Sequence, residues 1–458
     1  MEERTRMMKS LVIVFFGLCS GFINAQDSLI FMDSIPKIEY NDSLSAYHFH
    51  NFRDMDTSMQ SVYPFVDYSK NNYRFYSRKS DNFEMLYKKL ARLISRKEGK
   101  LNMYHIGGSH LQADIYTHDV RTYLQTRWEG VTGERGWVFP FDLAKTNNPG
   151  NYEFSSPNKW TPYRSVVHKP HKVNFDYGIL GAAVTCSDSA IVIYFRHDRT
   201  TIKPPITRLR IFHNIGEFPY WMNFGEQELL VASVEHNAEL GYSEIAFTDP
   251  VDTLDIQFCR IGTHAPELEI HGFLMMNDEP GISYTSIGIN GAGLYTYLDN
   301  IRFEEQLASY PPDFFAYSVG TNDGNVPYSK FIPEVYKKNL EKMMQMALRA
   351  NPNCALLLTV PNDSYYKRRY LNKNIARERE VIIKLAEEYN MAVWDLYGVM
   401  GELGSSRTWK INQLMRSDLI HFTHAGYHFK GELYIDAFLK FMDQMEFRTL
   451  ALENVIWK

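Results

Sequence analysis

The chain has 458 residues, of which 45% are hydrophobic, 22% charged and 14% aromatic, so a disordered, collagen-like or small disulfide-bonded protein is excluded. A chain of this length can bury a large core and predicts two or three folding units, or one domain with a large insertion. The 49 basic and 54 acidic residues give a net charge of −5 without a basic cluster, which argues against a nucleic acid as the partner.

The N-terminal segment 1–25 has the layout of a signal peptide. Three basic residues precede the apolar run 11–18, and small or neutral residues lead to Ala25. This run is too short to span a membrane, and no later segment is long and apolar enough, so we expect an exported, periplasmic or extracellular protein without a transmembrane segment. A lipid anchor on Cys19 is an alternative, although the bulky Leu18 before it is unfavourable.

Residues 26–99 are predicted to form a lead-in segment that ends in a helix over 82–96. A different pattern begins at residue 100. A buried strand over 101–106 leads to two consecutive glycines, and helical spacing follows over 111–128. We therefore expect the first part of an α/β domain over residues 100–150.

The same alternation of strands and helices returns over residues 279–458. The expected strands cover 314–319, 355–360 and 392–396, and the expected helices cover 330–350, 371–389 and 425–442. Repeated strand and helix units predict a parallel sheet with helices on both faces. In such sheets a ligand binds beyond the carboxyl ends of the strands.

Residues 151–278 show no convincing helix. Short runs typical of strands cover 190–196, 208–213, 228–234, 243–247, 254–259 and 268–275. We expect an antiparallel β-sandwich inserted into the α/β domain. Four aromatic residues of this stretch could form a surface that stacks on sugar rings, although packing inside the sandwich is the more common role of such residues: Trp160, Tyr163, Tyr220 and Trp221.

Three cysteines remain after the predicted signal peptide: Cys186, Cys259 and Cys354. An odd number allows at most one internal pair. Cys186 and Cys259 lie in the same β-rich stretch and could form a disulfide, or both could be separately buried thiols. No close spacing of cysteines and histidines is typical of a zinc site.

Two segments carry the residue types of nucleophilic catalysis. Ser109 follows the Gly-Gly turn at the start of an expected helix, where the turn exposes the hydroxyl and the helix start offers N–H groups to an oxyanion. Asp418 precedes His421 by three residues and could hold its ring toward a serine. Each has an alternative, since Ser109 could be only a helix cap and His421 could simply pack in a loop.

Two further segments offer hydrogen-bond donors at the ends of strands. Asn322 follows the expected strand 314–319, and its side-chain amide could donate to an oxyanion. Gly291 follows a short strand over 282–285 and offers a backbone amide at a similar height. Both segments could also be only turns.

Together and in this order, the four segments resemble the SGNH hydrolases, also called the GDSL esterase and lipase family. The resemblance covers roughly residues 100–150 and 280–445 and implies a flavodoxin-like parallel sheet. It implies that Ser109 is the nucleophile, that Asp418 and His421 complete a triad, and that the Ser109 and Gly291 amides form an oxyanion hole with Asn322. No metal or organic cofactor is implied.

One residue departs from that family pattern, since Gly108 stands where the family usually has aspartate. The run 133–151, the β-rich stretch and the signal peptide resemble an exported, Bacteroides-like branch of the family. We therefore expect an exported serine esterase that removes short acyl groups, mainly O-acetyl, from a glycan or a cell-wall polymer such as peptidoglycan. The alternatives are an O-acyltransferase with the same triad and a non-catalytic glycan-binding protein.

Overall fold

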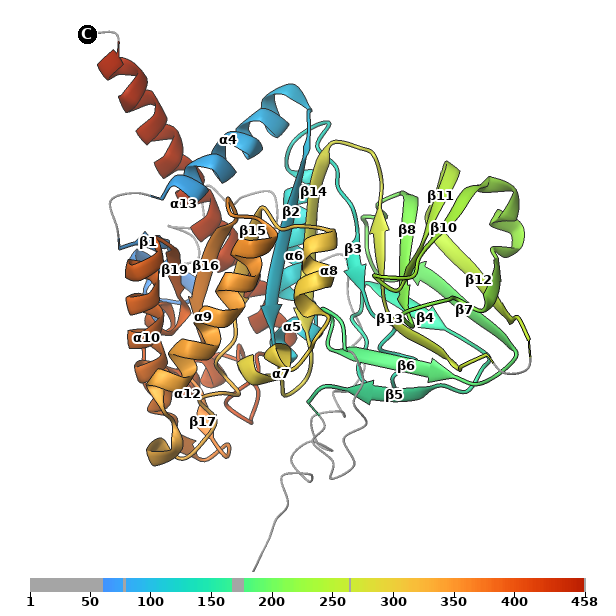
Figure 1. Ribbon diagram of the computed structural model, residues 1–458. Coiled ribbons are helices and arrows are strands. Elements are labelled where there is room, and N and C mark those ends of the chain that lie inside the picture. Colours follow the sequence, from blue (N-terminus) through green and yellow to red (C-terminus); the bar gives the residue numbers. More distant parts are fainter. Residues whose placement is uncertain (1–60, 77–79, 167–176, 263–264, 457–458) are drawn as a thin grey trace, which may run out of the picture. The chain divides into compact units, whose positions relative to one another are not determined.

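The computed structural model describes residues 61–76, 80–166, 177–262 and 265–456, with side chains up to residue 446. The predicted signal peptide and most of the predicted lead-in segment lie outside these residues. The described residues form a parallel-containing sheet flanked by helices and a region of antiparallel sheets (Figure 1).

The central sheet has six strands. They lie in the order β1 (Tyr73–Phe75), β19 (Ala392–Asp395), β16 (Ala355–Val360), β15 (Phe314–Ser318), β2 (Lys100–Gly107) and β14 (Gly281–Gly288). All neighbours pair in parallel except β1, which runs antiparallel to β19 at the edge. Counted along the chain from β2, the parallel strands follow the order 2-1-3-4-5 of flavodoxin-like sheets. The predicted fold class is confirmed.

Helices cover both faces of this sheet. They are α4 (Asp81–Arg96), α5 (Ser109–Gln112), α6 (Tyr116–Thr126), α7 (Leu294–Leu298), α8 (Phe303–Ser309), α9 (Pro333–Ala350), α10 (Asn374–Tyr389), α11 (Leu396–Met400), α12 (Ser405–Ile411) and α13 (His424–Ile456). Within the described residues, no helix has both the length and the apolar character needed to cross a membrane.

Strand β15 shows how the two faces are packed. Its side chains alternate, because successive residues of a strand point to opposite faces. Phe314 and Ala316 pack in a core with residues of α4, α6 and α13. Phe315 and Tyr317 pack in the other core with residues of α8, α9 and α10. A strand buried on both sides explains why this segment is a continuous apolar run.

The helix predicted over 111–128 is wrong in one respect, since it is broken into α5 and α6. The break contains Asp114, whose φ of 45° is incompatible with a continuous helix. The Asp114 carboxylate accepts hydrogen bonds from Thr117, Arg121 and Arg135. These contacts hold the backbone out of the helical path.

The second region consists of two antiparallel sheets. One has the order β10 (Val231–Asn237), β11 (Tyr242–Val251), β8 (Ile206–His213), β13 (Leu268–Met276), β6 (Ala182–Cys186) and β5 (Thr161–Arg164), with β3 (Gly136–Val138) also on β13. The other has the order β4 (Tyr152–Ser155), β7 (Ala190–His197), β12 (Thr253–Arg260) and β9 (Tyr220–Asn223). The Phe154 and Phe273 rings, one from each sheet, lie 4.9 Å apart. The strands therefore pack face to face, and their separate status as an inserted domain over 151–278 stays a prediction.

Some predicted elements of this region need correction. The run 228–234 begins as the 3-10 helix η3 (Gly225–Leu230) and becomes strand only at Val231. Strands β3 to β6 and β9 carry too few residues for a clear alternation, and β6 is buried at all five positions.

Around the parallel sheet, the short helices α7, α8, α11 and α12 were likewise not predicted, because each spans at most two turns.

The aromatic residues considered for sugar stacking do not share a surface. Trp160 and Tyr220 are only 3% and 2% exposed and belong to the core, whereas Trp221 is 55% exposed. Tyr163 is half-buried. A stacking surface made of all four residues is therefore excluded, and core packing accounts for two of them. The thiols of Cys186, Cys259 and Cys354 are free.

Candidate active site

Ser109 lies at the point of the sheet where the strand order reverses. Strand β2 ends at Gly107, Gly108 is the N-cap of α5, and Ser109 is the first residue of that helix. Its N–H group has no acceptor within the helix, as at every helix start. The chain leaves β2 toward β14 and later returns to β15 on the other side. The crevice at such a switch point is the usual ligand site of an open α/β sheet.

Ser109, His421 and Asp418 form a continuous line of hydrogen bonds. Ser109 Oγ lies 2.8 Å from His421 Nε2, and His421 Nδ1 lies 2.8 Å from Asp418 Oδ2. Ser109 and His421 are 6% and 7% exposed, so water has little access to these bonds. The sequence-predicted nucleophile, base and acid are brought together although 312 residues separate Ser109 from His421.

The Asp418 carboxylate is held in its ionised form. Its Oδ1 atom accepts the backbone N–H groups of Ile420 and His421, each at 2.9 Å. Burial alone would raise the pKa of Asp418, but the hydrogen bonds and charge of His421 hold that pKa well below its usual range. An ionised carboxylate assigns the proton of His421 to Nδ1. Nε2 then has a free lone pair that accepts a hydrogen bond from the Ser109 hydroxyl.

The loop that carries Asp418 and His421 is closed by backbone hydrogen bonds. The Arg416 N–H donates to the His421 carbonyl at 2.8 Å, and the Thr423 N–H donates to the Leu414 carbonyl at 3.0 Å. Leu419, inside the loop, has a φ of 57°. This tight turn points the Asp418 carboxylate back at the His421 ring just before α13 begins.

The segments of Gly291 and Asn322 meet beside Ser109. Asn322 Nδ2 donates to the Ala292 carbonyl at 2.9 Å, and the Asn290 N–H donates to Gln112 Oε1 of α5 at 2.7 Å. Gly291 lies between these two contacts with a φ of 84°, which favours glycine. The loop after β14 is thus tied both to Asn322 and to the helix that begins with Ser109.

The packing around residue 108 explains why glycine occupies this position. A Cβ atom at this position would lie 2.9 Å from Asn322 Nδ2 and 3.2 Å from the Ala292 carbonyl oxygen. The first distance is shorter than real contacts of this kind. Glycine therefore provides the space in which the Asn322 amide packs against the backbone before Ser109, and aspartate in this place would displace that amide.

His110 and Gln112 support the site. The place of His110 beside Ser109 in the sequence predicts a supporting or structural role, whereas no sequence pattern singled out Gln112. His110 is buried, its Nδ1 lies 2.9 Å from the Tyr427 hydroxyl, and its ring centroid lies 5.1 Å from that of His421. Burial and the nearby Lys430 charge hold the pKa of His110 well below its usual range. A neutral ring beside His421 adds no charge that would oppose its protonation. The closeness of His110 and Gln112 to Ser109 in the sequence was the available signal.

Asp323 adds a tie between the loops that follow β14 and β15. Its carboxylate accepts a hydrogen bond from the Leu294 N–H at 3.0 Å, and burial raises the pKa of Asp323 to about 7.

Across the described parts of the chain, no group of three or more His, Cys, Asp or Glu side chains is placed to hold a metal ion.

Residues 275–429 match the model of the GDSL-like lipase/acylhydrolase family. The match, called the GDSL-like segment below, covers less than half of the chain. The GDSL-like segment contains Gly291, Asn322, Asp418 and His421, whereas Ser109 lies well before its first residue. This match and the SGNH-type fold support a serine ester hydrolase.

One solved structure shares the fold over most of the chain. A peptidoglycan O-acetylesterase superposes with a TM-score of 0.65 and 16% identity, over 83% of this chain and 98% of the other. That likeness shows a common fold. The acetylxylan esterase Axe2 from Geobacillus stearothermophilus has 22% identity over 36% of this chain and 73% of the other, with a TM-score of 0.27. A search of curated protein sequences finds no significant match.

Proposed function

We propose that this protein is an exported esterase that uses Ser109 to remove short acyl groups, mainly O-acetyl, from a glycan or cell-wall polymer. The main support for this reaction is the pair of 2.8 Å contacts that link Ser109 to His421 and His421 to Asp418. The substrate class is supported by the fold shared with a peptidoglycan O-acetylesterase. The signal-peptide layout of the segment 1–25 supports export.

In the first half of the reaction, Ser109 Oγ attacks the ester carbonyl while His421 Nε2 takes the hydroxyl proton. A tetrahedral oxyanion forms, and the imidazolium of His421 is stabilised by the Asp418 carboxylate. His421 then gives the proton to the leaving sugar oxygen, and the acyl group remains on Ser109 as an ester.

In the second half, water attacks the acyl-serine. His421 takes a proton from this water, and the second tetrahedral oxyanion collapses to release the acid. The proton returns to Ser109 Oγ. No step requires a group beyond these side chains and water.

The oxyanion is proposed to bind three donors: the Ser109 N–H, the Gly291 N–H and Asn322 Nδ2. One hydrogen of the Asn322 amide is used by the Ala292 carbonyl. The second hydrogen of that amide is available for the oxyanion, and the bond to Ala292 fixes the plane of the amide beforehand. Donors that are oriented before the reaction stabilise the transition state without a cost of reorganisation.

The test is hydrolysis of a short-chain aryl acetate by the purified protein and by Ser109→Ala. We expect a loss of several orders of magnitude in kcat for the variant. Ser405→Ala, at the start of α12, is the matched control and should retain activity. Full activity in Ser109→Ala would contradict the proposal.

Acetylated peptidoglycan and acetylated xylan then separate the polymer classes by the acetate that each releases. A transferase with the same triad is distinguished by adding a sugar acceptor, because acyl transfer to the acceptor would outcompete release of free acid. A binding protein without activity would hydrolyse none of these esters.

A further inference from the structure

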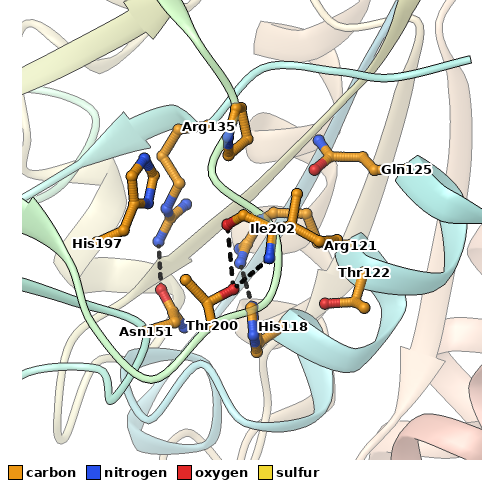
Figure 2. Close-up of a pocket in the computed structure, with 10 residues that line it drawn as sticks. His118, Arg121, Thr122, Gln125, Arg135, Asn151, His197, Thr200 and Ile202 are labelled. Carbon is orange, nitrogen blue, oxygen red and sulfur yellow. Dashed lines mark hydrogen bonds between the residues drawn. The ribbon is translucent and has the colours of Figure 1, made fainter. Parts of the chain in front are cut away.

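A small pocket whose lining does not include Ser109 lies between α6 and the segment that joins β7 to β8. Figure 2 shows side chains turned toward one space: His118 and Arg121 from α6, Arg135 and Asn151 from the residues just before β3 and β4, and His197 and Thr200 from the end of β7 and the segment after it. Its empty volume is about 230 Å³, part of it open to solvent. The proposed mechanism uses none of these residues.

Counted over the side chains that line this pocket and the one carboxylate that they bind, positive charges exceed negative ones by one. The Arg121 and Arg135 side chains are 4% and 6% exposed, and both pair with the same carboxylate, Asp114, at 2.9 and 3.2 Å. The other side-chain groups that bond to this carboxylate, Thr117 and Asn151, are neutral. Two buried guanidinium groups therefore share one buried carboxylate. An uncompensated buried charge is costly unless a counter-ion approaches it.

The surrounding groups do not remove this excess. Burial and the charge of Arg121 lower the pKa of Arg135 only to about 10, so the guanidinium stays charged at neutral pH. Burial lowers the pKa of His118 to about 3 and that of His197 to about 4, so both rings are neutral. The remaining charges that act on His197 are one exposed acid, Asp252, and one exposed base, Lys203, which offset each other.

Arg135 also has an unsatisfied hydrogen-bond donor. Its Nη2 atom donates to Asp114 and to Asn151, and its guanidinium lies over the Tyr152 ring at 5.0 Å. Its Nη1 atom is buried and has no partner among the described residues, and the same holds for Nε2 of His197. A buried N–H of a charged group without an acceptor is rare in folded proteins.

We propose that this pocket binds a small monoanion, a halide or a simple carboxylate, which accepts a hydrogen bond from Nη1 of Arg135 and balances the excess charge of the two arginines. One excess charge matches a monoanion. Asp114 lies at the break between α5 and α6, shortly after Ser109 in the chain. The anion therefore stabilises the junction that holds the helix of Ser109 in place.

The direct probe is chloride, observed by the line width of its 35Cl resonance as the intact protein is added. The wild-type protein is expected to broaden the line, and Arg135→Gln, which removes the excess charge, is expected to abolish most of this broadening. Arg196→Gln is the matched control, because Arg196 is exposed and pairs with Glu153 outside the pocket. This variant should broaden the line as the wild type does.

Titration with acetate distinguishes the two sources of the anion. If acetate reverses the broadening, carboxylates share the site, and if it does not, the site takes halides. Should Arg135→Gln fail to fold by circular dichroism, Arg135→Lys keeps the ion pair with Asp114 but lacks the Nη1 donor, and the same loss is expected. Equal broadening by the wild type and a folded Arg135 variant would overturn the proposal and leave water as the occupant.

Discussion

Two hydrogen-bonded pairs of histidine and aspartate occur among the described residues, and one of them faces a serine. His421 Nδ1 lies 2.8 Å from Asp418, and His428 Nδ1 lies 2.6 Å from Asp119. The second nitrogen of His421 contacts Ser109 Oγ, whereas that of His428 lies 3.1 Å from His424 Nδ1. A hydrogen-bonded pair of histidine and aspartate is therefore no sign of catalysis by itself, because the third partner decides what the imidazole can do.

The positions of the two pairs explain this difference. Asp418 and His421 belong to the loop before α13, which lies near the carboxyl end of β2, where parallel strands present polar residues to a crevice. Asp119 and His428 join α6 to α13, two helices that pack together over one face of the sheet. The second pair therefore contributes to stability rather than to an acyl transfer.

The largest expected effect is that of His421→Ala. We expect kcat for an aryl acetate to fall by about 10⁵-fold or more, because a triad acts as a unit. His428→Ala removes the equivalent residue of the other pair and should change kcat by less than about threefold. Steady-state kinetics on both folded variants test the comparison, and similar losses in the two would contradict it.

Asp418→Asn should lower kcat by about 10⁴-fold, because an amide can donate to His421 and favour the wrong tautomer. Asp119→Asn makes the same chemical change in the other pair. Its kcat should stay close to that of the wild type. An Asp418→Asn enzyme with near-normal kcat would show that the His421 tautomer does not depend on this carboxylate.

Asn322→Ala should lower kcat by about 10²- to 10³-fold with little change in KM, the usual cost of removing one oxyanion donor. Asn325→Ala changes the same residue type in the same loop and serves as its control. A change confined to KM would mean that Asn322 binds the substrate instead of the transition state.

Gly108→Ala should reduce kcat by about 10- to 100-fold, because the new Cβ would lie 2.9 Å from Asn322 Nδ2 and displace this amide. If this is the mechanism, adding Gly108→Ala to Asn322→Ala should cause little further loss. Independent, additive losses would show that Gly108 acts on something other than Asn322.

The smallest effect concerns stability at the second pair. Burial alone would lower the pKa of His428, but the hydrogen bond and charge of Asp119 raise it above its usual value. A raised histidine pKa stabilises the fold fully below the unfolded pKa of about 6.5, and this contribution fades as the pH rises through the folded value. His428→Ala should cost about 1.5 kcal/mol at about pH 5.5 and less at about pH 9, measured by urea unfolding. A cost that grows with pH would contradict this sign.

Much of the parallel domain could be predicted from sequence because its elements are local. Buried strands such as 355–360 are continuous apolar runs, and amphipathic helices such as α9 repeat apolar residues every three or four positions. The polar residues that follow these strands lead to one edge of the sheet. Because parallel strands end at the same edge of a sheet, these positions predict that Ser109 and Asn322 share one candidate site.

The remaining features depend on contacts between distant parts of the chain. The break at Asp114 depends on a hydrogen bond from Arg135, which follows α6 in the chain. The space beside Gly108 is filled by Asn322, which follows β15 and is separated from Gly108 in the sequence by the whole antiparallel region. Likewise, burial of Trp160 is decided by strands that pair across the sandwich. Periodicity and local propensity carry no information on such contacts.

Whether Ser109 is a nucleophile activated by His421 is tested most directly by covalent labelling with a fluorophosphonate, followed by mass spectrometry of the digested protein. An activated serine attacks the phosphorus atom and displaces fluoride, so only a nucleophile with a working base is labelled quickly. We predict one label per chain, on the peptide that contains Ser109, and its loss in His421→Ala but not in His428→Ala. Labelling of another serine, or of Ser109 at an equal rate without His421, would contradict the account.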